Sequence, residues 1–297
     1  MVIQAPISEP PTEPKWQVIV RLLRWDKPAG RLILMVPALW AIFLAARGAP
    51  PWPLIVVIII GTLATSAAGC VVNDLWDRDI DPDVERTQNR PLASRALTVQ
   101  TGIMVALVAF ACAGGLALYL NPLSLALCIA AVPVIIGYPL AKRFFPIPQL
   151  VLSIAWGFAV LISWTAAVGQ LEPTAWLLWG ATVLWTLGFD TVYAMSDRED
   201  DQKLGINSSA IFFGDQVANA VGLFFLGTIG LLTAVGVWAN LHLGFWVTLA
   251  LGTGVWIWQY VRLRQAEIPQ LTYGAIFQQN VWVGFILLGG MILGTLA

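Results

Sequence analysis

Charged residues are scarce in this sequence. Only 11% of its 297 residues are Asp, Glu, Lys or Arg, whereas 58% are hydrophobic. Soluble domains carry about 25% charged residues, so the composition excludes a soluble globular protein. The formal net charge of −1 also gives no electrostatic basis for binding nucleic acid. We therefore expect an integral membrane protein.

Residues that bind soft metals are equally few. The single histidine, His242, lies in a short polar break, where a surface position explains it better than metal binding. The cysteines, Cys70, Cys112 and Cys128, all lie in apolar runs without metal-ligand spacing, so we interpret them as small packing residues. We expect no cleavable signal peptide, because the N-terminus is polar and rich in proline.

Long apolar runs, in contrast, fill most of the chain. Nine of them are about 18 to 23 residues long, which is enough to cross a bilayer with modest tilt. They cover residues 24–46, 54–72, 101–120, 122–139, 148–169, 174–194, 217–239, 243–263 and 278–297. The runs are continuous rather than alternating, which favours helices over membrane β-strands. The predicted fold class is all-α, a multi-pass membrane bundle of nine transmembrane helices.

The polar segments between these runs predict the domain organisation and the orientation. We expect residues 1–16 to form a disordered N-terminal tail and residues 17–297 to form one membrane domain. With nine spans, the N-terminus and every second connection share one side of the membrane. Of the 16 Lys and Arg residues, only Arg47 falls on the other side. Basic residues accumulate on the cytoplasmic side, so the shared side is predicted to be cytoplasmic.

Two acidic segments lie at the ends of two predicted spans, both on that side. Residues 73–92 read NDLWDRDIDPDVERTQNRPL, and residues 190–201 read DTVYAMSDREDD. If each segment continues as a helix, its oxygen-bearing side chains at spacings of four and seven line one face. These residues are Asn73, Asp77 and Asp81 in the first segment, and Asp190, Asp197 and Asp201 in the second. An ionised carboxylate at membrane depth is costly in free energy, so we expect each one to have a charged or polar partner or a functional role.

The two segments offer oxygen ligands and no soft ligands, which favours Mg²⁺ or Ca²⁺ over Zn²⁺. Mg²⁺ commonly binds through a few carboxylates together with substrate phosphates. Two opposed acidic clusters therefore predict a Mg²⁺ site that bridges a diphosphate.

A diphosphate also needs positive charge from the protein, and basic residues flank both acidic segments. Arginine grips phosphate through two parallel hydrogen bonds, whereas lysine acts as a point charge. The diphosphate-binding candidates are Arg86, Arg90, Lys142, Arg198 and Lys203. Tyr138 precedes Lys142 by one turn and completes this group.

These motifs together resemble the UbiA superfamily of intramembrane aromatic prenyltransferases, and most closely its 4-hydroxybenzoate polyprenyltransferases. The resemblance covers nearly the whole chain and rests on five motifs. They are NDxxDxxxD at Asn73, Asp74, Asp77 and Asp81, VxRTxxRPL at Val84 to Leu92, YxxxK at Tyr138 and Lys142, DTxYAMxDxxDDxKxGI from Asp190 onward, and DKPxG at Asp26 to Gly30.

The resemblance implies a nine-helix bundle around a central cavity that opens sideways to lipid, with cytoplasmic capping loops. It implies Mg²⁺-dependent transfer of a polyprenyl group from polyprenyl diphosphate to 4-hydroxybenzoate, at the ring carbon ortho to the phenol. Ubiquinone or plastoquinone biosynthesis would use the product. The expected partners are these two substrates and membrane lipid, with no obligate protein partner.

The resemblance also implies a role for each candidate residue. The metal ligands are expected to be Asn73, Asp77, Asp81, Asp197 and Asp201. The catalytic candidates are Asp74, Asp190, Lys142 and Tyr138, with Asp74 or Asp190 orienting the phenol or stabilising the allylic cation. For the acceptor's carboxylate, Arg143 is the first candidate and Arg31 the second.

Several alternatives remain open on the sequence alone. Within the same reaction class, the acceptor could be homogentisate, dihydroxynaphthoate, haem or a chlorophyllide. A CDP-alcohol phosphotransferase would need a DGxxAR element, which the chain lacks. A cation transporter would place its carboxylates near the bilayer midplane, whereas these lie at span ends beside Arg and Lys.

Overall fold

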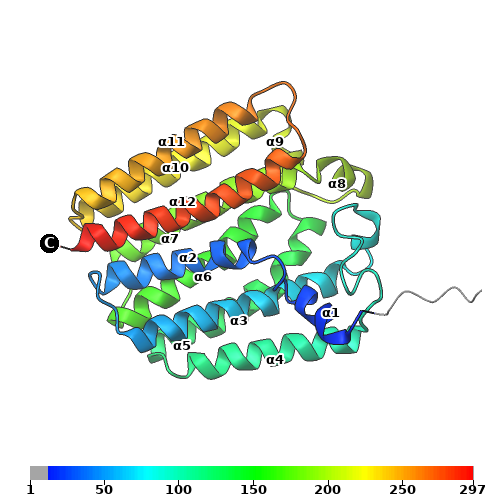
Figure 1. Cartoon of the computed structure of the whole chain (residues 1–297), viewed down its shortest axis with the longest axis horizontal. Helices are drawn as coiled ribbons and strands as arrows, with labels where there is room; N and C mark the ends of the chain where they lie inside the picture. Colours follow the sequence, from blue (N-terminus) through cyan, green and yellow to red (C-terminus); the bar gives the residue numbers. More distant parts are fainter. Residues whose placement is uncertain (1–12, 297) are drawn as a thin grey trace, which may run out of the picture.

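The computed structural model describes residues 13–296, and within them the chain forms helices and no strand. The long helices lie side by side, roughly along one axis (Figure 1). They are α2 (Ala29–Ala45), α3 (Trp52–Asp77), α4 (Val99–Ala117), α5 (Pro122–Gly137), α6 (Pro148–Val168), α7 (Pro173–Met195), α10 (Val217–Trp238), α11 (Leu243–Leu263) and α12 (Leu271–Thr295). Each predicted span coincides with one of these helices, so the all-α prediction is confirmed.

Six helical segments of the described chain are long and apolar enough to cross a membrane. They are residues 52–77, 99–117, 122–143, 148–168, 209–238 and 271–295. Among the others, α2 has only 17 residues. Helices α7 and α11 are longer, but Trp and Thr residues lower their hydropathy. A multi-pass membrane protein is therefore confirmed.

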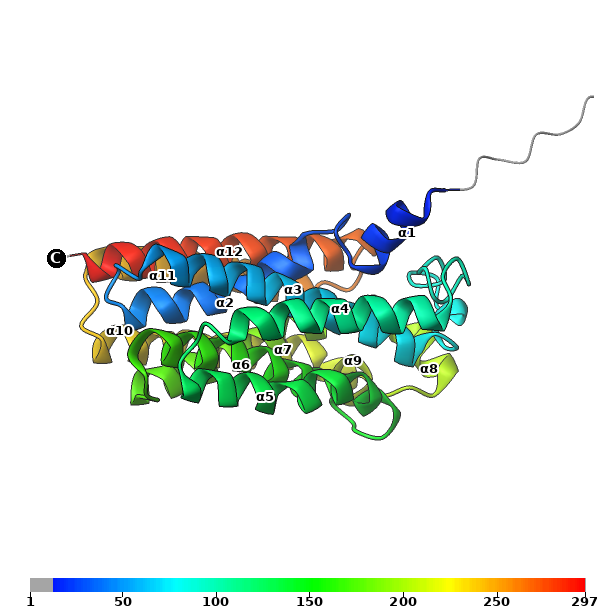
Figure 2. The same cartoon turned by 90° about the horizontal axis from the view of Figure 1, so that it is seen from below.

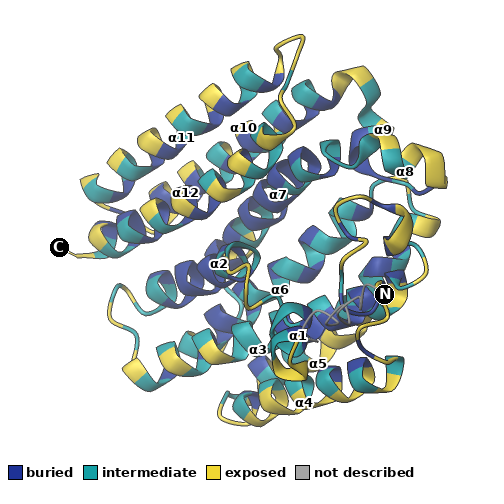
Figure 3. Cartoon of the chain, turned by 45° about the vertical axis from the view of Figure 1, so that its right-hand side comes forward, coloured by how far each residue is buried: buried dark blue, intermediate teal, exposed yellow. Residues whose placement is uncertain are grey.

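Helix α7 lies at the centre of the bundle. It packs against α6, α10 and α12, and most of its length is buried (Figure 3). Trp185 of α7 packs against Trp40 of α2, with the two rings tilted and their centroids 5.0 Å apart. Both indole N–H groups of this pair are hydrogen-bonded, since Trp40 donates to the carbonyl of Gly284 and Trp185 donates to the side chain of Asn280. A buried polar group without such a partner would cost stability.

The short elements gather at one end of the bundle, opposite the C-terminus (Figures 1 and 2). They are α1 (Lys15–Leu22), η1 (Asp81–Asp83), η2 (Tyr138–Arg143), α8 (Arg198–Leu204), α9 (Ser209–Phe213) and η3 (Gly214–Gln216). Most of the predicted tail, residues 1–12, lies outside the described residues. Its last residues belong to the fold, because α1 already begins at Lys15.

The prediction that each acidic segment continues as one helix was wrong. Helix α3 ends at Asp77, and Asp81 follows after a turn as the first residue of the 3-10 helix η1, which contains Pro82. Helix α7 ends at Met195, so Asp197 lies in the turn before α8. The first predicted span also begins late, at Ala29, because Pro28 interrupts the backbone hydrogen bonding.

Candidate active site

Two connected hollows lie at the junction of the long helices and the short elements. The larger has a volume of about 940 Å³ and is enclosed by α2 to α7 and α12; we call it the apolar cavity. The smaller has a volume of about 240 Å³ and lies under the loops; we call it the acidic pocket. Both are lined by Asn73, Arg86, Arg90, Tyr138, Leu152, Asp190 and Tyr193. The two hollows therefore adjoin along a shared wall.

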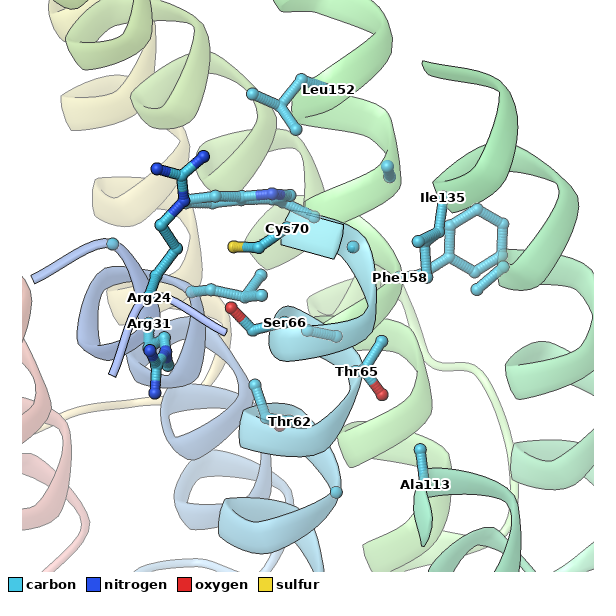
Figure 4. A pocket seen from close by; sticks show the side chains of 18 of the residues that line it. Arg24, Arg31, Thr62, Thr65, Ser66, Cys70, Ala113, Ile135, Leu152 and Phe158 are labelled. Carbon is cyan, nitrogen blue, oxygen red and sulfur yellow. The ribbon is translucent and has the colours of Figure 1, made fainter. Parts of the chain in front are cut away.

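The apolar cavity is lined by both polar and apolar side chains near the loops, and mainly by apolar side chains deeper in. Figure 4 shows Arg24 and Arg31 on one side, with Ile135 and Phe158 on the opposite side. Helix α3 contributes small side chains such as Ser66, and α4, α5 and α6 contribute mainly alkyl and aromatic groups. Such a cavity suits a ligand with a polar head and a long hydrocarbon tail.

The acidic pocket holds three ion pairs. The Nζ atom of Lys142 lies 2.8 Å from Oδ2 of Asp77. The same separation joins Nη1 of Arg90 to Oδ2 of Asp81. Across the pocket, Arg86 donates to both oxygens of Asp197, with its shortest contact at 2.5 Å. Each carboxylate of these pairs therefore faces a basic residue.

The loop after α3 folds back over the pocket through local hydrogen bonds. The hydroxyl of Thr87 donates to the carbonyl of Asp81 at 3.0 Å, which closes the turn around Pro82. Arg90 then reaches back to α3 and donates to the side chain of Asn73 at 3.3 Å. The segment thereby brings Asp81 and Arg90 beside the end of α3.

The second acidic segment closes the opposite side. The N–H of Asn207 donates to the carbonyl of Lys142 at 2.8 Å and ties this segment to η2. Burial, with a further contribution from neighbouring Asp197, raises the pKa of Asp201 to about 6. The ionised form of Asp201 is therefore destabilised in this arrangement, and a cation bound in the pocket would stabilise it.

The donor atoms fit a hard divalent cation. All five expected ligands, Asn73, Asp77, Asp81, Asp197 and Asp201, line the acidic pocket. Oδ1 of Asp77 is buried without a hydrogen-bond partner, which leaves an oxygen free for a cation. In the described residues no three Asp, Glu, His or Cys side chains converge closely enough to enclose a metal ion. The ion pairs explain this, because basic groups stand between the carboxylates.

Some of the predicted site residues lie elsewhere. Arg143 donates to the carbonyl of Trp76 and lines neither hollow. Lys203 contacts Asp200 on the surface, at 3.5 Å, and Arg198 also lines neither hollow. Arg31 does line the apolar cavity. These positions leave Arg86, Arg90 and Lys142 as the basic residues at the acidic pocket.

Two residues at the site were missed by the sequence reasoning. Arg24, in the link between α1 and α2, lies 2.5 Å from Oδ1 of the fully buried Asp74. The hydroxyl of Tyr193 accepts a hydrogen bond from Arg86, whose guanidinium also sits 4.8 Å from the Tyr193 ring centroid. No short sequence pattern indicates either contact, because each contact joins segments that are far apart in the sequence.

Comparisons with known proteins agree with this geometry. The sequence model of the UbiA prenyltransferase family matches residues 34–281. Over 296 residues the chain is 63% identical to a Synechocystis protein named 4-hydroxybenzoate solanesyltransferase, with 100% of both chains covered. It is 41% identical over 276 residues to an Azoarcus 4-hydroxybenzoate octaprenyltransferase, covering 93% of this chain and 96% of the relative.

Solved structures share the fold. A UbiA homolog from Aeropyrum pernix, in its apo form, superposes with a TM-score of 0.78 at 25% identity, covering 88% of this chain and 97% of that one. A UbiA homolog from Archaeoglobus fulgidus bound to GPP and Mg²⁺ superposes with a TM-score of 0.69 at 19% identity, covering 91% and 99%.

Proposed function

Since the chain belongs to the UbiA prenyltransferase family, we propose that it transfers a polyprenyl group from polyprenyl diphosphate to 4-hydroxybenzoate. The carbon–oxygen bond to diphosphate breaks, the prenyl carbon bonds to the ring carbon ortho to the phenol, and that ring carbon then loses its proton, which restores aromaticity. The observation that carries this proposal is that a charged pocket adjoins a large, mainly apolar cavity and shares lining residues with it. That arrangement suits a substrate with an anionic head and a hydrocarbon tail.

The acidic pocket binds the diphosphate. Arg86, Arg90 and Lys142 line it and donate hydrogen bonds to the phosphate oxygens, whose negative charge grows as the carbon–oxygen bond breaks. When bound, Mg²⁺ supplies further positive charge to the leaving group. Its ligands are Asn73, Asp77, Asp81, Asp197 and Asp201.

The apolar cavity holds the prenyl tail and excludes water from the reacting carbon. An allylic cation reacts readily with water, so a dry site is needed for transfer to the ring. Asp190 and Tyr138 line both hollows and therefore stand where the prenyl carbon meets the acceptor. We assign Asp190 to orienting the phenol. Asp74 has a different role, because it is fully buried against Arg24 and Arg90 and holds these two residues in place.

We extend the proposal to the membrane setting. All nine long helices cross the bilayer, the short elements cap the site, and the site faces the cytoplasm, as the distribution of Lys and Arg favours. The prenylated product then serves ubiquinone or plastoquinone biosynthesis. The substrates and membrane lipid are the partners, and no obligate protein partner is required.

The proposal is tested by prenyl transfer in isolated membranes. The assay contains 4-hydroxybenzoate, Mg²⁺ and polyprenyl diphosphates of several lengths. We expect a prenylated hydroxybenzoate that disappears with EDTA and in Asp77→Asn. Asp83→Asn is the matched control, because Asp83 lies in the adjoining turn but is exposed and lines neither hollow. Product with homogentisate or dihydroxynaphthoate alone would contradict the acceptor, and full activity of Asp77→Asn would contradict the metal ligands.

A further inference from the structure

Arg24 occupies a backbone position that favours glycine. Its φ angle is +57°, in the left-handed region. The N–H of Arg24 bonds to the carbonyl of Arg21, and the N–H of Trp25 bonds to the carbonyl of Val20. These two bonds close α1 with the cap that glycine usually provides. Arg47 and Arg95 share this conformation, so what sets Arg24 apart is the set of contacts that its side chain makes.

The side chain of Arg24 is held firmly and yet remains available. Its Nη2 atom lies 2.5 Å from Oδ1 of Asp74, which is fully buried at the end of α3. Among the described residues, no other hydrogen bond of the Arg24 side chain is present, so its remaining N–H groups are free to donate. Arg24 also lines the apolar cavity, beside Cys70 in Figure 4.

The basic residues of the site divide into two groups. Arg86, Arg90 and Lys142 line the acidic pocket and pair with expected metal ligands. A second group lines the apolar cavity but not the acidic pocket: Arg24, Lys27 and Arg31. The first group surrounds the place for the diphosphate. The second group lies apart from that place, so a member with free donors is available to a different anion in the apolar cavity.

Arg31 supports the segment that carries Arg24. Its guanidinium donates to the carbonyl of Leu23 and lies 5.4 Å from the ring of Trp25. Both contacts fix the link on either side of Arg24. Arg31 thus acts on the backbone of the link, whereas Arg24 presents its own donors to the cavity.

We propose that Arg24 binds the carboxylate of the aromatic acceptor, with Asp74 as the positioning residue that orients the Arg24 guanidinium. This inference rests on the proposed function and assigns the acceptor's anionic group to a residue of the α1–α2 link. A carboxylate can accept two parallel hydrogen bonds from one guanidinium. Binding at Arg24 places the far, phenol end of the acceptor toward Asp190 and the acidic pocket.

Arg24→Gly tests this assignment, and Arg24→Lys is the companion variant that keeps a positive charge beside the buried Asp74. The glycine substitution removes the side chain and gives the position the residue that its φ angle favours. Arg47→Gly is the matched control, since Arg47 has a φ angle of +49°, is exposed and follows the C-terminal end of α2, whereas Arg24 precedes the N-terminal end of that helix. Each variant is assayed for KM toward 4-hydroxybenzoate and toward polyprenyl diphosphate. Inhibition by benzoate and by 4-hydroxybenzamide is measured in parallel.

We expect Arg24→Gly to raise the KM for 4-hydroxybenzoate about 10- to 100-fold, as the loss of a charged hydrogen bond predicts. Inhibition by benzoate should weaken equally, whereas inhibition by the uncharged benzamide and the KM for polyprenyl diphosphate should not change. Arg24→Lys should recover part of the affinity. Equal effects on benzoate and benzamide, or a raised KM for polyprenyl diphosphate, would overturn the assignment. Failure of the wild-type chain to prenylate 4-hydroxybenzoate would instead contradict the proposed function.

Discussion

The ammonium group of Lys142 lies 2.8 Å from the carboxylate of Asp77. A proposed diphosphate-binding residue therefore forms an ion pair with a proposed metal ligand. Arg90 with Asp81 and Arg86 with Asp197 repeat the relationship. Binding of the metal and the diphosphate together would exchange these partners, with carboxylates turning to the metal and basic groups turning to phosphate. Metal binding alone would have to break the ion pairs without this compensation.

Lys142→Met therefore separates metal affinity from turnover. Removing the competing ammonium should tighten Mg²⁺ binding in the absence of prenyl diphosphate, by about tenfold if the pair resembles other charged hydrogen bonds. Turnover should fall at the same time, because the diphosphate loses a donor. Calorimetric titration of the purified protein with Mg²⁺ measures the first effect. Lys203→Met, on the surface, should change neither quantity, and unchanged or weaker Mg²⁺ binding by Lys142→Met would contradict the exchange.

Asp74→Asn tests the positioning role of Asp74. The carboxylate is fully buried and lies 2.5 Å from Arg24 and 3.3 Å from Arg90. Breaking a buried ion pair by removing one charge typically costs about 3–5 kcal/mol, so the thermal midpoint should fall clearly. Asp79→Asn is the comparison, because Asp79 pairs with Arg95 on the exposed surface and should have no measurable effect. Equal thermal midpoints for the two variants would show that the ion pairs of Asp74 do not stabilise the fold.

Asp201→Asn should stabilise the folded protein while it impairs the reaction. Burial raises the pKa of Asp201 to about 6, well above the ordinary value for an aspartate, so the folded state disfavours the ionised form. The resulting destabilisation is fully present above pH 6 and disappears as the pH falls toward 4. In EDTA, the variant should melt at a higher temperature than wild type at pH 7.5, and the difference should shrink at pH 5. A difference in melting temperature that is larger at pH 5 than at pH 7.5 would contradict the raised pKa of Asp201.

Gly61→Leu tests whether the prenyl tail runs along α3. Gly61 lines the apolar cavity, and a Cβ placed there meets no atom within 4 Å. It lies about 18 Å from Asn73 along the helix axis, at a rise of about 1.5 Å per residue. The added side chain should block long tails and spare short ones, so the ratio of long-chain to short-chain transfer should fall.

The control for this substitution is Gly115→Leu. A Cβ at Gly115 also meets nothing, but Gly115 is exposed and does not line the cavity. Competition between a short and a long prenyl diphosphate, with products separated by chromatography, gives the ratio directly. The same loss of long-chain product in both variants would argue against a tail beside Gly61.

The membrane architecture could be predicted because it depends on long apolar runs and on charge between them, both of which are local. The oxygen-rich residues from Asn73 to Asp81 could be found for the same reason, since their spacing is visible within one segment. Their geometry was partly missed. Helix α3 ends at Asp77, before Asp81 is reached, yet the hydrogen bond from Thr87 to the Asp81 carbonyl holds the loop that places Asp81 at the pocket.

The pairing of basic residues could not be predicted. Arg143 and Lys142 are neighbours in the sequence, but the turn of η2 directs Lys142 to Asp77 and leaves Arg143 against the backbone of Trp76. Arg24 lies outside every motif considered at the acidic pocket and meets Asp74 only in the folded chain. Such contacts depend on tertiary packing, which a periodic pattern does not encode.

The shared wall between the acidic pocket and the apolar cavity also bears on the direction of the reaction. A diphosphate leaves toward the aqueous loops, where it is well hydrated, and a prenylated aromatic leaves toward the hydrocarbon interior. The two products therefore separate into different phases as soon as they are released. Reversal of the proposed transfer would require both products to return to the same site at once, so this partitioning would oppose the reverse reaction.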